Sequence, residues 1–396
     1  MTQGPLSGVR VLELGTLIAA PFATRILADF GAEVVKVESP GEGDPLRSWG
    51  QVPEQLSLWW SVQARNKRSI TVDLRRPNGQ EVVRRLARAS HVVVENFRPG
   101  RLDAWGLGFE QLRAENPRLV MVRISGFGQT GPYRHRPGFG NIAECMGGLR
   151  YITGHAEGPP LRVGVSIGDH IAALYSVIGA LMALRHAERE GAGQVVDVAL
   201  TESIFSFLEG ILPEYGATGR VRERSGNDLH NAAPSNVYRT ADDVWMAISG
   251  NGDSIFQRLM RAIGRDDLAA DPGLQSNPGR VRRVREIDAA IGAWAEARTA
   301  AEVTAALEAA DVPFGPVYSV ADIAEDPQYR ERGMVLEVAD PRYGTVSQPG
   351  VMPKLSATPG GVERAGPELG VDTDDVLRSV GYDEREIERL RADGVV

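Results

Sequence analysis

The stretch that decides the fold runs from Val9 to Glu38 and reads VRVLELGTLIAAPFATRILADFGAEVVKVE. Val9–Leu14 and Glu33–Glu38 are short and β-branched, with apolar centres, which is typical of buried strands. Between them, Pro21–Phe30 carries apolar residues at helical spacing. A strand, a helix and a second strand in this order predict a βαβ unit with parallel strands.

The same alternation continues along the first half of the chain. Gly79–Ala89 and Phe109–Glu115 have helical periodicity, and His91–Phe97, Leu119–Ser125 and Gln194–Leu200 are strand-like. Strands that are almost wholly apolar at their centres belong to a parallel sheet that is covered on both faces. The sequence therefore predicts an α/β fold whose large lobe is a Rossmann-like open parallel sheet.

A change of composition marks a second, smaller lobe. Residues 216–233 are polar and charged, and Ser235–Gly250 then indicates a hairpin followed by helices to about residue 310. We expect a large lobe over residues 1–215, an inserted small lobe over residues 216–325, and a segment over residues 326–396 that returns to the large lobe. The return is predicted to begin at Val312–Val317 and to include Pro341–Gly361 and a closing helix at Asp383–Ala392.

Composition excludes several classes of protein. The 396 residues carry 44 Lys and Arg against 52 Asp and Glu, so the overall field does not favour a nucleic-acid partner. A single cysteine, Cys145, allows neither an intramolecular disulfide nor a thiolate metal cluster and fits a reducing compartment. The start of the chain lacks an export signal, and the longest apolar run, Ile171–Leu184, is shorter than the roughly 20 residues of a membrane span. We therefore expect a cytoplasmic protein without a membrane partner, with this run in a buried helix.

Two motifs resemble known sites but lack the required context. Gly126–Gly131 has the spacing G-x-G-x-x-G, yet Pro132 and charged residues follow where a phosphate-binding helix would begin. Gly164–Gly168 matches the G-x-S-x-G of serine hydrolases, but the last histidine of the chain, His230, lies well short of the C-terminal position expected for the catalytic histidine. None of the six histidines has metal-ligand spacing, and we predict no metal site.

Asp169 follows Gly168 and precedes the long apolar helix, which places it at or near the helix N-cap. One interpretation is a structural cap, because Asp is among the preferred N-cap residues. The other is a reactive carboxylate that the helix dipole keeps ionised, next to a glycine that lets a substrate approach. The residues alone leave both interpretations open.

Motifs along nearly the whole chain resemble the class III CoA-transferases, the CaiB/BaiF family that includes formyl-CoA transferases. They are Val11–Leu14 with Pro21, Gly31–Glu38, Gly43-Asp44 with Arg47 and Trp49, Asn66–Ser69, Asp73-Leu74, Glu95–Gly100, Ser125–Pro132, Gly168-Asp169, Pro313 with Gly315–Val317, and Lys354–Pro359. The resemblance implies two lobes per chain and a homodimer of interlocked rings. It also implies transfer of CoA from an acyl-CoA, with succinyl-CoA as one candidate donor, to a carboxylic or dicarboxylic acid.

The resemblance also assigns roles to residues. Asp169 would be the catalytic nucleophile, forming an acyl-aspartyl anhydride and then an aspartyl-CoA thioester. CoA would enter as a substrate, and no permanently bound cofactor is expected. The positions that match the family's CoA contacts are Ile18, Ala19, Val72, Asp73, Leu74, Arg75, Asn96, Phe97, Arg98, Arg136, Pro137, Gly138 and Phe139. Ala104 stands where many members have an arginine, so Arg98 or Arg101 would take over that phosphate contact.

Departures from the family pattern restrict the substrate. Ile18 and Gly140 replace a glutamine and a glutamate of the formyl-CoA:oxalate branch, which disfavours formyl and oxalyl transfer. Phe139 replaces the histidine of the related racemases, and a phenyl ring cannot carry a proton as an imidazole does. Two alternatives stay open: a 2-methylacyl-CoA racemase or epimerase, and a non-catalytic homologue that binds CoA.

Overall fold

The computed structural model describes residues 4–50 and 57–396. These residues form two compact units. The first consists of the described residues up to Leu149, Val163–Leu212 and Pro327–Val396, and the second of Arg150–Arg162 and Pro213–Asp326.

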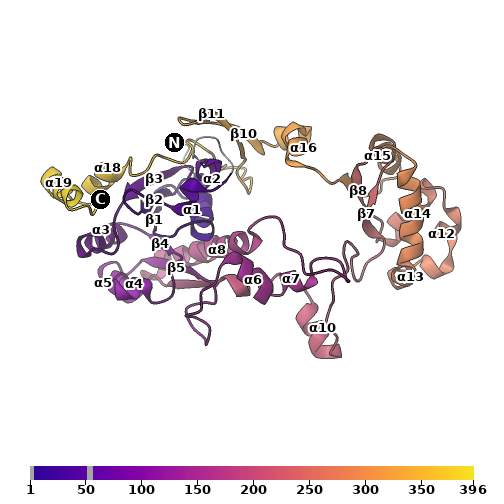
Figure 1. Ribbon diagram of the computed structural model, residues 1–396, viewed down its shortest axis with the longest axis horizontal. Coiled ribbons are helices and arrows are strands. Elements are labelled where there is room, and N and C mark those ends of the chain that lie inside the picture. Colours follow the sequence, from indigo (N-terminus) through magenta and orange to yellow (C-terminus); the bar gives the residue numbers. More distant parts are fainter. Residues whose placement is uncertain (1–3, 51–56) are drawn as a thin grey trace. The chain divides into compact units, whose positions relative to one another are not determined.

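The first unit is built on a six-stranded parallel sheet (Figure 1). Its strands are β1 (Arg10–Glu13), β2 (Glu33–Glu38), β3 (Lys67–Thr71), β4 (Val92–Glu95), β5 (Val120–Ser125) and β6 (Val195–Ala199). They are arranged in the order β3-β2-β1-β4-β5-β6, with every neighbouring pair parallel. The predicted Rossmann-like parallel sheet is therefore confirmed, and the direction of winding changes between β1 and β4.

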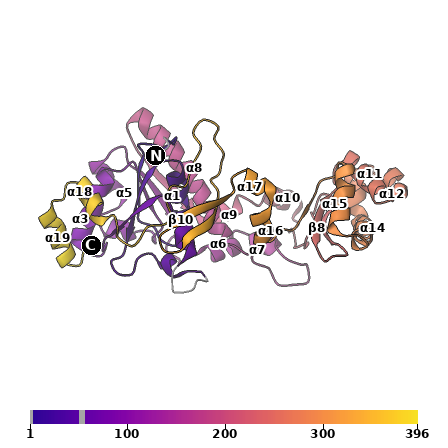
Figure 2. The same cartoon turned by 90° about the horizontal axis from the view of Figure 1, so that it is seen from above.

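Helices cover both faces of this sheet (Figure 2). On one face lie α1 (Ala19–Asp29) and α8 (Ile167–Glu190), and on the other lie α3 (Pro77–Arg88) and α5 (Phe109–Glu115), together with α18 (Thr373–Ser379) and α19 (Glu384–Ala392). Successive residues of a strand point to opposite faces. In β1, Val11 therefore packs into the cluster under α1 and α8, while Leu12 packs into the cluster under α3.

Shorter elements of the first unit connect or flank these layers. They are η1 (Pro45–Ser48), α2 (Leu58–Gln63), α4 (Arg101–Ala104), α6 (Gly140–Met146), α9 (Leu200–Phe205), α17 (Pro327–Glu331), and the hairpin of β10 (Val335–Asp340) and β11 (Gly344–Pro349). Two helices, α7 (Leu149–Ile152) and α10 (Ile211–Thr218), begin in the first unit and end in the second, and α16 (Val320–Glu325) belongs to the second. The closing helix predicted at the C-terminus is α19, which packs into the core of the first unit.

The second unit has its own antiparallel sheet and core. The sheet has the order β7 (Ser235–Arg239), β8 (Trp245–Ser249) and β9 (Phe314–Pro316). The helices are α11 (Asp253–Ala262), α12 (Asp266–Ala270), η3 (Pro272–Leu274), α13 (Asn277–Arg282), α14 (Val284–Glu296) and α15 (Ala300–Ala309). The return to the first unit does not begin at Val312–Val317 as predicted, because Phe314 pairs with Ile248 and adds a third strand to the predicted hairpin.

Residues 150–162 belong to the second unit, whereas the sequence analysis placed them in the large lobe. Contacts from far along the chain explain this assignment. The backbone N–H of Gly226 donates to the carbonyl of Gly154 at 2.9 Å, and Arg224 Nη1 donates to the carbonyl of Tyr151 at 2.9 Å.

Helix α8 differs from the fully buried helix that its sequence predicts. It has 24 residues, is long and apolar enough to cross a membrane by length and composition, and is only 44% buried over its most apolar window. Its buried side consists largely of small residues such as Ala172, Ala180 and Ala183. Its opposite side exposes larger apolar residues, among them Ile178 and Met182.

Candidate functional site

A pocket of about 240 Å³ lies at the carboxyl ends of the first four strands. It is lined by Leu14 and Thr16 after β1, Val37–Ser39 with Gly43 and Asp44 at and after β2, Val72–Arg75 after β3, and Phe97 with Trp105 after β4. In open α/β sheets, ligands bind at the carboxyl ends of the strands where the winding direction changes, which here is between β1 and β4. This pocket is therefore the candidate ligand site of the first unit.

The structure brings part of the predicted CoA-binding set to this pocket. Val72, Asp73, Leu74, Arg75 and Phe97 line it. Phe97 packs edge-on against Trp105, with ring centroids 5.7 Å apart, so the apolar wall is held in place. The Arg75 side chain is 77% exposed and pairs with Asp73, with Nε and Oδ1 2.8 Å apart.

Other predicted contacts occupy different surroundings. Ile18 and Ala19 are buried at the start of α1. The Asn96 side chain is bonded to the backbone of Thr16, where its Oδ1 accepts the N–H at 2.9 Å and its Nδ2 donates to the carbonyl at 2.8 Å. Arg98 is exposed after β4. The guanidinium of Arg101, also exposed, lies 5.5 Å from the centroid of the Trp105 ring.

The remaining predicted contacts lie in the glycine-rich loop after β5. The Arg136 guanidinium stacks on Tyr133 at 3.7 Å, Pro137 is exposed, and the Phe139 side chain is 67% exposed. Gly138 approaches Gly126 so closely that a Cβ on Gly138 would lie 3.1 Å from the Cα of Gly126. This approach folds the loop back on itself, and no helix follows Gly131 where a dinucleotide site would need one.

Asp169 is the third residue of α8 and is half-buried. Ser166 occupies the N-cap position, so Asp169 lies near the N-cap as predicted but is not the cap itself. Its carboxylate lies against Gly140, the first residue of α6. A Cβ on Gly140 would lie 2.1 Å from Oδ2 and 2.9 Å from Cγ of Asp169. The carboxylate thus fills the space that any side chain at position 140 would need.

The start of α8 also packs closely against the start of α6. A Cβ on Gly168 would lie 3.0 Å from the carbonyl oxygen of Gly140. The first turns of α6 and α8 therefore meet through two glycines, with the Asp169 carboxylate between them. From the sequence, Gly140 is only a departure from a family branch, because its contact with Asp169 joins residues 29 positions apart.

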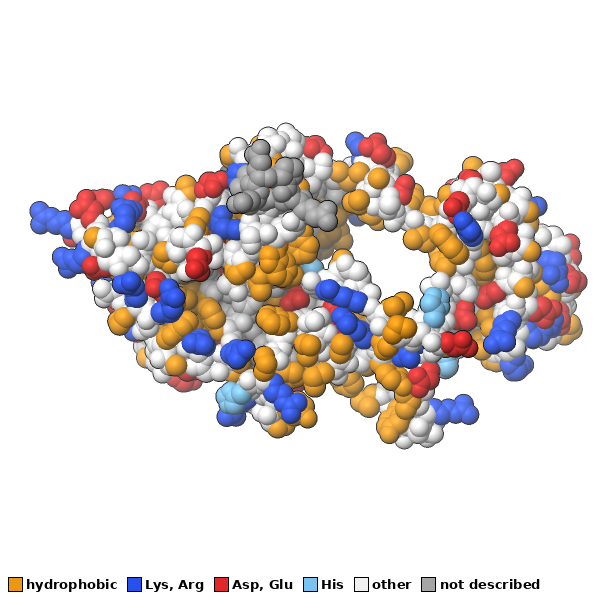
Figure 3. Space-filling view, in the orientation of Figure 1, with side chains coloured by type: hydrophobic (Ala, Val, Ile, Leu, Met, Phe, Trp, Pro, Cys, Tyr) orange, Lys and Arg blue, Asp and Glu red, His pale blue; other side chains and the backbone are white. Residues whose placement is uncertain are grey.

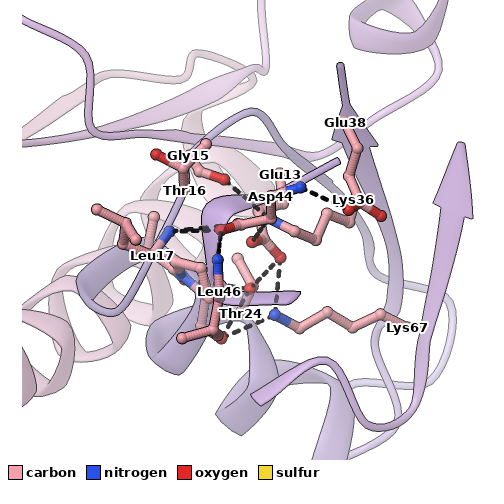
Figure 4. A network of polar contacts seen from close by, with 12 residues as sticks. Glu13, Gly15, Thr16, Leu17, Thr24, Lys36, Glu38, Asp44, Leu46 and Lys67 are labelled. Carbon is pink, nitrogen blue, oxygen red and sulfur yellow. Dashed lines mark hydrogen bonds and ion pairs between the residues drawn. The ribbon is translucent and has the colours of Figure 1, made fainter. Parts of the chain in front are cut away.

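A buried ionic network lies beneath the pocket (Figure 4). The Lys36 Nζ lies 2.8 Å from Glu13 Oε1 and 2.8 Å from Asp44 Oδ2. The Lys67 Nζ lies 2.8 Å from Glu13 Oε2, which also accepts a hydrogen bond from Thr24 Oγ1 at 2.6 Å. All five residues are buried. The network therefore joins β1, β2 and β3 to α1 and to the loop after β2.

Charge within the network shifts its protonation equilibria. Burial raises the pKa of Glu13, but Lys36 and Lys67 outweigh this effect and lower it to about 2. Burial lowers the pKa of Lys67 to about 8, although Glu13 opposes the shift. Lys36 has a raised pKa, because Asp44 and Glu13 overcome the opposing effect of its burial. Lys36 is thus the more strongly held of the two cations.

Loss of the Glu13 charge in acid will destabilise the fold. Because the pKa of Glu13 is lowered on folding, its contribution to stability is complete above about pH 4.5 and is lost as the pH falls towards 2. Urea unfolding at pH 6, 4 and 3 should show that the parent loses about 2 kcal/mol more stability by pH 3 than Glu13→Gln does. Glu388→Gln, an exposed control on α19, should lose as much as the parent. Equal losses in all three proteins would contradict the expectation.

Comparison with known proteins agrees with the fold and the sequence motifs. The sequence pattern of CoA-transferase family III matches residues 6–373. The chain is 48% identical to a succinyl-CoA–D-citramalate CoA-transferase of Chloroflexus aurantiacus, over 99% of this chain and 98% of that protein. It is 41% identical to the beta subunit of a succinyl-CoA–L-malate CoA-transferase of the same organism, over 100% and 99% of the two chains.

A solved structure gives the same result. A CAIB/BAIF family protein from Brucella suis superposes with a TM-score of 0.85 at 34% identity, over 96% of this chain and all of that chain. The match of the family pattern, the identity over whole chains and the shared fold agree with one another. The chain therefore belongs to CoA-transferase family III, the CaiB/BaiF family.

Proposed function

We propose that this CoA-transferase moves CoA from succinyl-CoA to a dicarboxylic acid of the citramalate or malate type, with Asp169 as the nucleophile. The activities of the two relatives named above support the choice of donor and acceptor. The observation that carries the role of Asp169 is its place in the first turn of α8, with its carboxylate against Gly140.

The pocket at the ends of β1–β4 suits CoA. Val72, Leu74 and Phe97 offer apolar surface to an adenine or a pantetheine arm. Arg75, at the mouth of the same pocket, offers a guanidinium to a phosphate, which it can bind in a bidentate manner. CoA is thus a bound substrate in this proposal, and no permanent cofactor takes part.

The proposed reaction uses one carboxylate twice. An oxygen of Asp169 attacks the thioester carbon of succinyl-CoA, and the C–S bond breaks. The CoA thiolate is released, and an acyl-aspartyl anhydride remains on the enzyme. The thiolate then attacks Cγ of Asp169, which releases succinate and leaves an aspartyl-CoA thioester. The acceptor carboxylate attacks Cγ to form a second anhydride, and the released thiolate attacks the acceptor carbonyl, which restores Asp169. One thioester replaces another, so no oxidant, reductant or nucleotide is consumed.

The position of Asp169 suits this chemistry for two reasons. The unpaired N–H groups and the dipole of the 24-residue helix α8 favour an ionised carboxylate in its first turn. The contact with Gly140 restricts where the carboxylate lies, and restriction of a reacting group lowers the entropic part of the barrier.

Asp169→Asn tests the nucleophile with almost no change in shape. We expect transfer from succinyl-CoA to citramalate or malate to fall to background, because an amide neither attacks a thioester nor accepts CoA. Intact-mass spectrometry of the parent mixed with succinyl-CoA should show an adduct that hydroxylamine removes and that maps to the peptide containing Asp169. Unchanged turnover in Asp169→Asn would refute the role. Exchange of the α-proton in deuterated water without an acceptor acid would favour the racemase instead.

Gly140→Ala tests the contact that restricts the carboxylate. The added Cβ would meet Oδ2 of Asp169 at 2.1 Å, so the carboxylate must move away from its present position. Displacement of a reacting group by about 1 Å can lower the rate about 100-fold, and we expect kcat to fall by that order. Gly164→Ala is the matched control, because a Cβ there meets nothing within 4 Å. Equal activity of the two variants would contradict the assignment.

We also infer a homodimer from the exposed side of α8. Leu174, Tyr175, Ile178, Leu181 and Met182 are all exposed and recur at the spacing of one helix face. Leu212 and Tyr215 of α10 are exposed as well. Apolar side chains reach the surface at several places in the space-filling view (Figure 3). An exposed apolar helix face is typical of an interface, and a second copy that interlocks with the first would cover it.

Light scattering after size-exclusion chromatography tests the dimer. The parent should elute at twice the mass of one chain, and Ile178→Arg should elute as a single chain because a guanidinium would be buried at the interface. Glu188→Arg, an exposed polar position on the same helix, should remain dimeric. A monomeric parent, or an Ile178→Arg variant that stays dimeric, would contradict the inference.

A further inference from the structure

The loop between β1 and α1 has an unusual backbone. Leu17 has φ 66°, in the left-handed region that residues with a Cβ rarely adopt. At Gly15, an added Cβ would lie 2.3 Å from the Cβ of Ala20 and 2.9 Å from Oδ1 of Asn96. Such a conformation persists only where the surroundings hold it.

Three side chains from other parts of the chain hold this loop. Lys36 Nζ donates to the carbonyl of Gly15 at 2.9 Å. Asn96 accepts the N–H of Thr16 and donates to its carbonyl. The N–H of Leu17 donates to the Asp44 carboxylate, 3.1 Å from Oδ1 and 3.2 Å from Oδ2 (Figure 4). Each residue from Gly15 to Leu17 is therefore bound through its backbone by a side chain.

These side chains are themselves fixed. Asp44 accepts the N–H of Leu46 at 2.9 Å and pairs with Lys36, so both of its oxygens are engaged within the protein. The N–H of Asp44 donates to Glu38 Oε2 at 3.0 Å, and Glu38 in turn is paired with Arg47. An ammonium and two carboxylates at 4% exposure or less have little freedom to reorient.

Stability alone does not explain this arrangement. Replacement of a buried ion pair by apolar residues of similar volume is often neutral or stabilising, so burial of Lys36 with Glu13 and Asp44 is weak evidence for a stabilising role. A fully satisfied polar network does, however, select one geometry among several. The geometry selected here is that of Gly15–Leu17.

This loop forms part of the candidate CoA pocket. Thr16 and Asp44 line the pocket together with Val72–Arg75 and Phe97. The loop also leads directly into Ile18, the N-cap residue of α1, and Ala19, its first residue. A shift of the loop backbone would therefore change the shape of the pocket.

We propose that Asp44 and Lys36 are positioning residues for the CoA substrate, which act by fixing the backbone of Gly15–Leu17 and with it Thr16, which lines the pocket. This inference rests on the proposed function, since it takes CoA as the occupant. Asp44 does not contact CoA through its carboxylate in this arrangement, because its oxygens bind Leu17, Leu46 and Lys36.

Two substitutions at Asp44 separate anchoring of the loop from loss of charge. Asp44→Ala removes the acceptor for the Leu17 N–H, whereas Asp44→Asn keeps an oxygen there. We expect the amides of Thr16 and Leu17 in Asp44→Ala to exchange with deuterium at least about tenfold faster than in the parent. In the same variant the Kd for CoA, and the KM for succinyl-CoA, should rise about tenfold or more, with kcat changed less than about threefold. Asp44→Asn should recover most of the protection and of the affinity.

The matched control is Asp340→Ala. Asp340 is also buried, and its Oδ2 lies 2.7 Å from Arg342 Nη2, but it belongs to β10 and does not line the pocket. It should lower thermal stability without changing exchange at Leu17 or the Kd for CoA. If Asp44→Ala yields no folded protein, Asp44→Asn supplies the measurement, with the smaller change in exchange and Kd.

Two results would overturn the proposal. Exchange at Thr16 and Leu17 that equals the parent's would show that Asp44 does not fix the loop. Faster exchange with an unchanged Kd for CoA would show that the loop is not part of the CoA site. Failure of the parent itself to bind CoA, or to form the Asp169 adduct, would instead refute the proposed function, whatever the exchange data show.

Discussion

The contacts of the buried Lys36 ammonium hold together the part of the sheet that borders the pocket. The ammonium comes from β2, which lies between β3 and β1, and is bonded to a carboxylate of β1, to Asp44 in the loop after β2 and to the carbonyl of Gly15. A cation this deeply buried is tolerated only when opposite charges and carbonyl oxygens surround it. Glu13 must then be ionised, and its second oxygen engages Lys67 from β3. One buried charge thus determines which residues are required on three neighbouring strands.

Elsewhere in the first unit, close packing depends on glycine residues rather than on charge. Gly140 and Gly168 bring α6 and α8 together, and Gly126 and Gly138 close the loop that leads to α6. Each of these contacts has backbone or a carboxylate where a Cβ would stand. The alanines on the inner side of α8 continue the same principle along the helix, because small side chains let it approach the sheet. The larger apolar residues are consequently left on its outer side.

Apolar periodicity predicted most of the large sheet and its helices, and β2 and α5 match their predicted residues at both ends. It missed β3, whose sequence KRSIT has no apolar run. Lys67 and Ser69 are buried there because Glu13 and Glu38 receive their polar groups, and periodicity treats buried positions as apolar. The unit to which residues 150–162 and β9 belong was also predicted wrongly. Both segments are held by pairing with distant segments, through Gly226 and Ile248, and such pairing leaves no local signal in the sequence.

Sequence information was also incomplete for the candidate site. Val72–Arg75 and Phe97 were expected in the CoA site only from the resemblance to the family, because β3, which Val72–Arg75 follow, was not predicted from the sequence. The role of Asp169 could not be decided from its surroundings in the sequence, since an N-cap and a nucleophile both suit an acid before an apolar helix. The structure separates the two positions. Ser166 holds the N-cap position here, although its side chain makes no capping hydrogen bond. Asp169, three residues further into the helix, still lies within the positive end of the dipole, which favours an ionised carboxylate, and this carboxylate lies against Gly140.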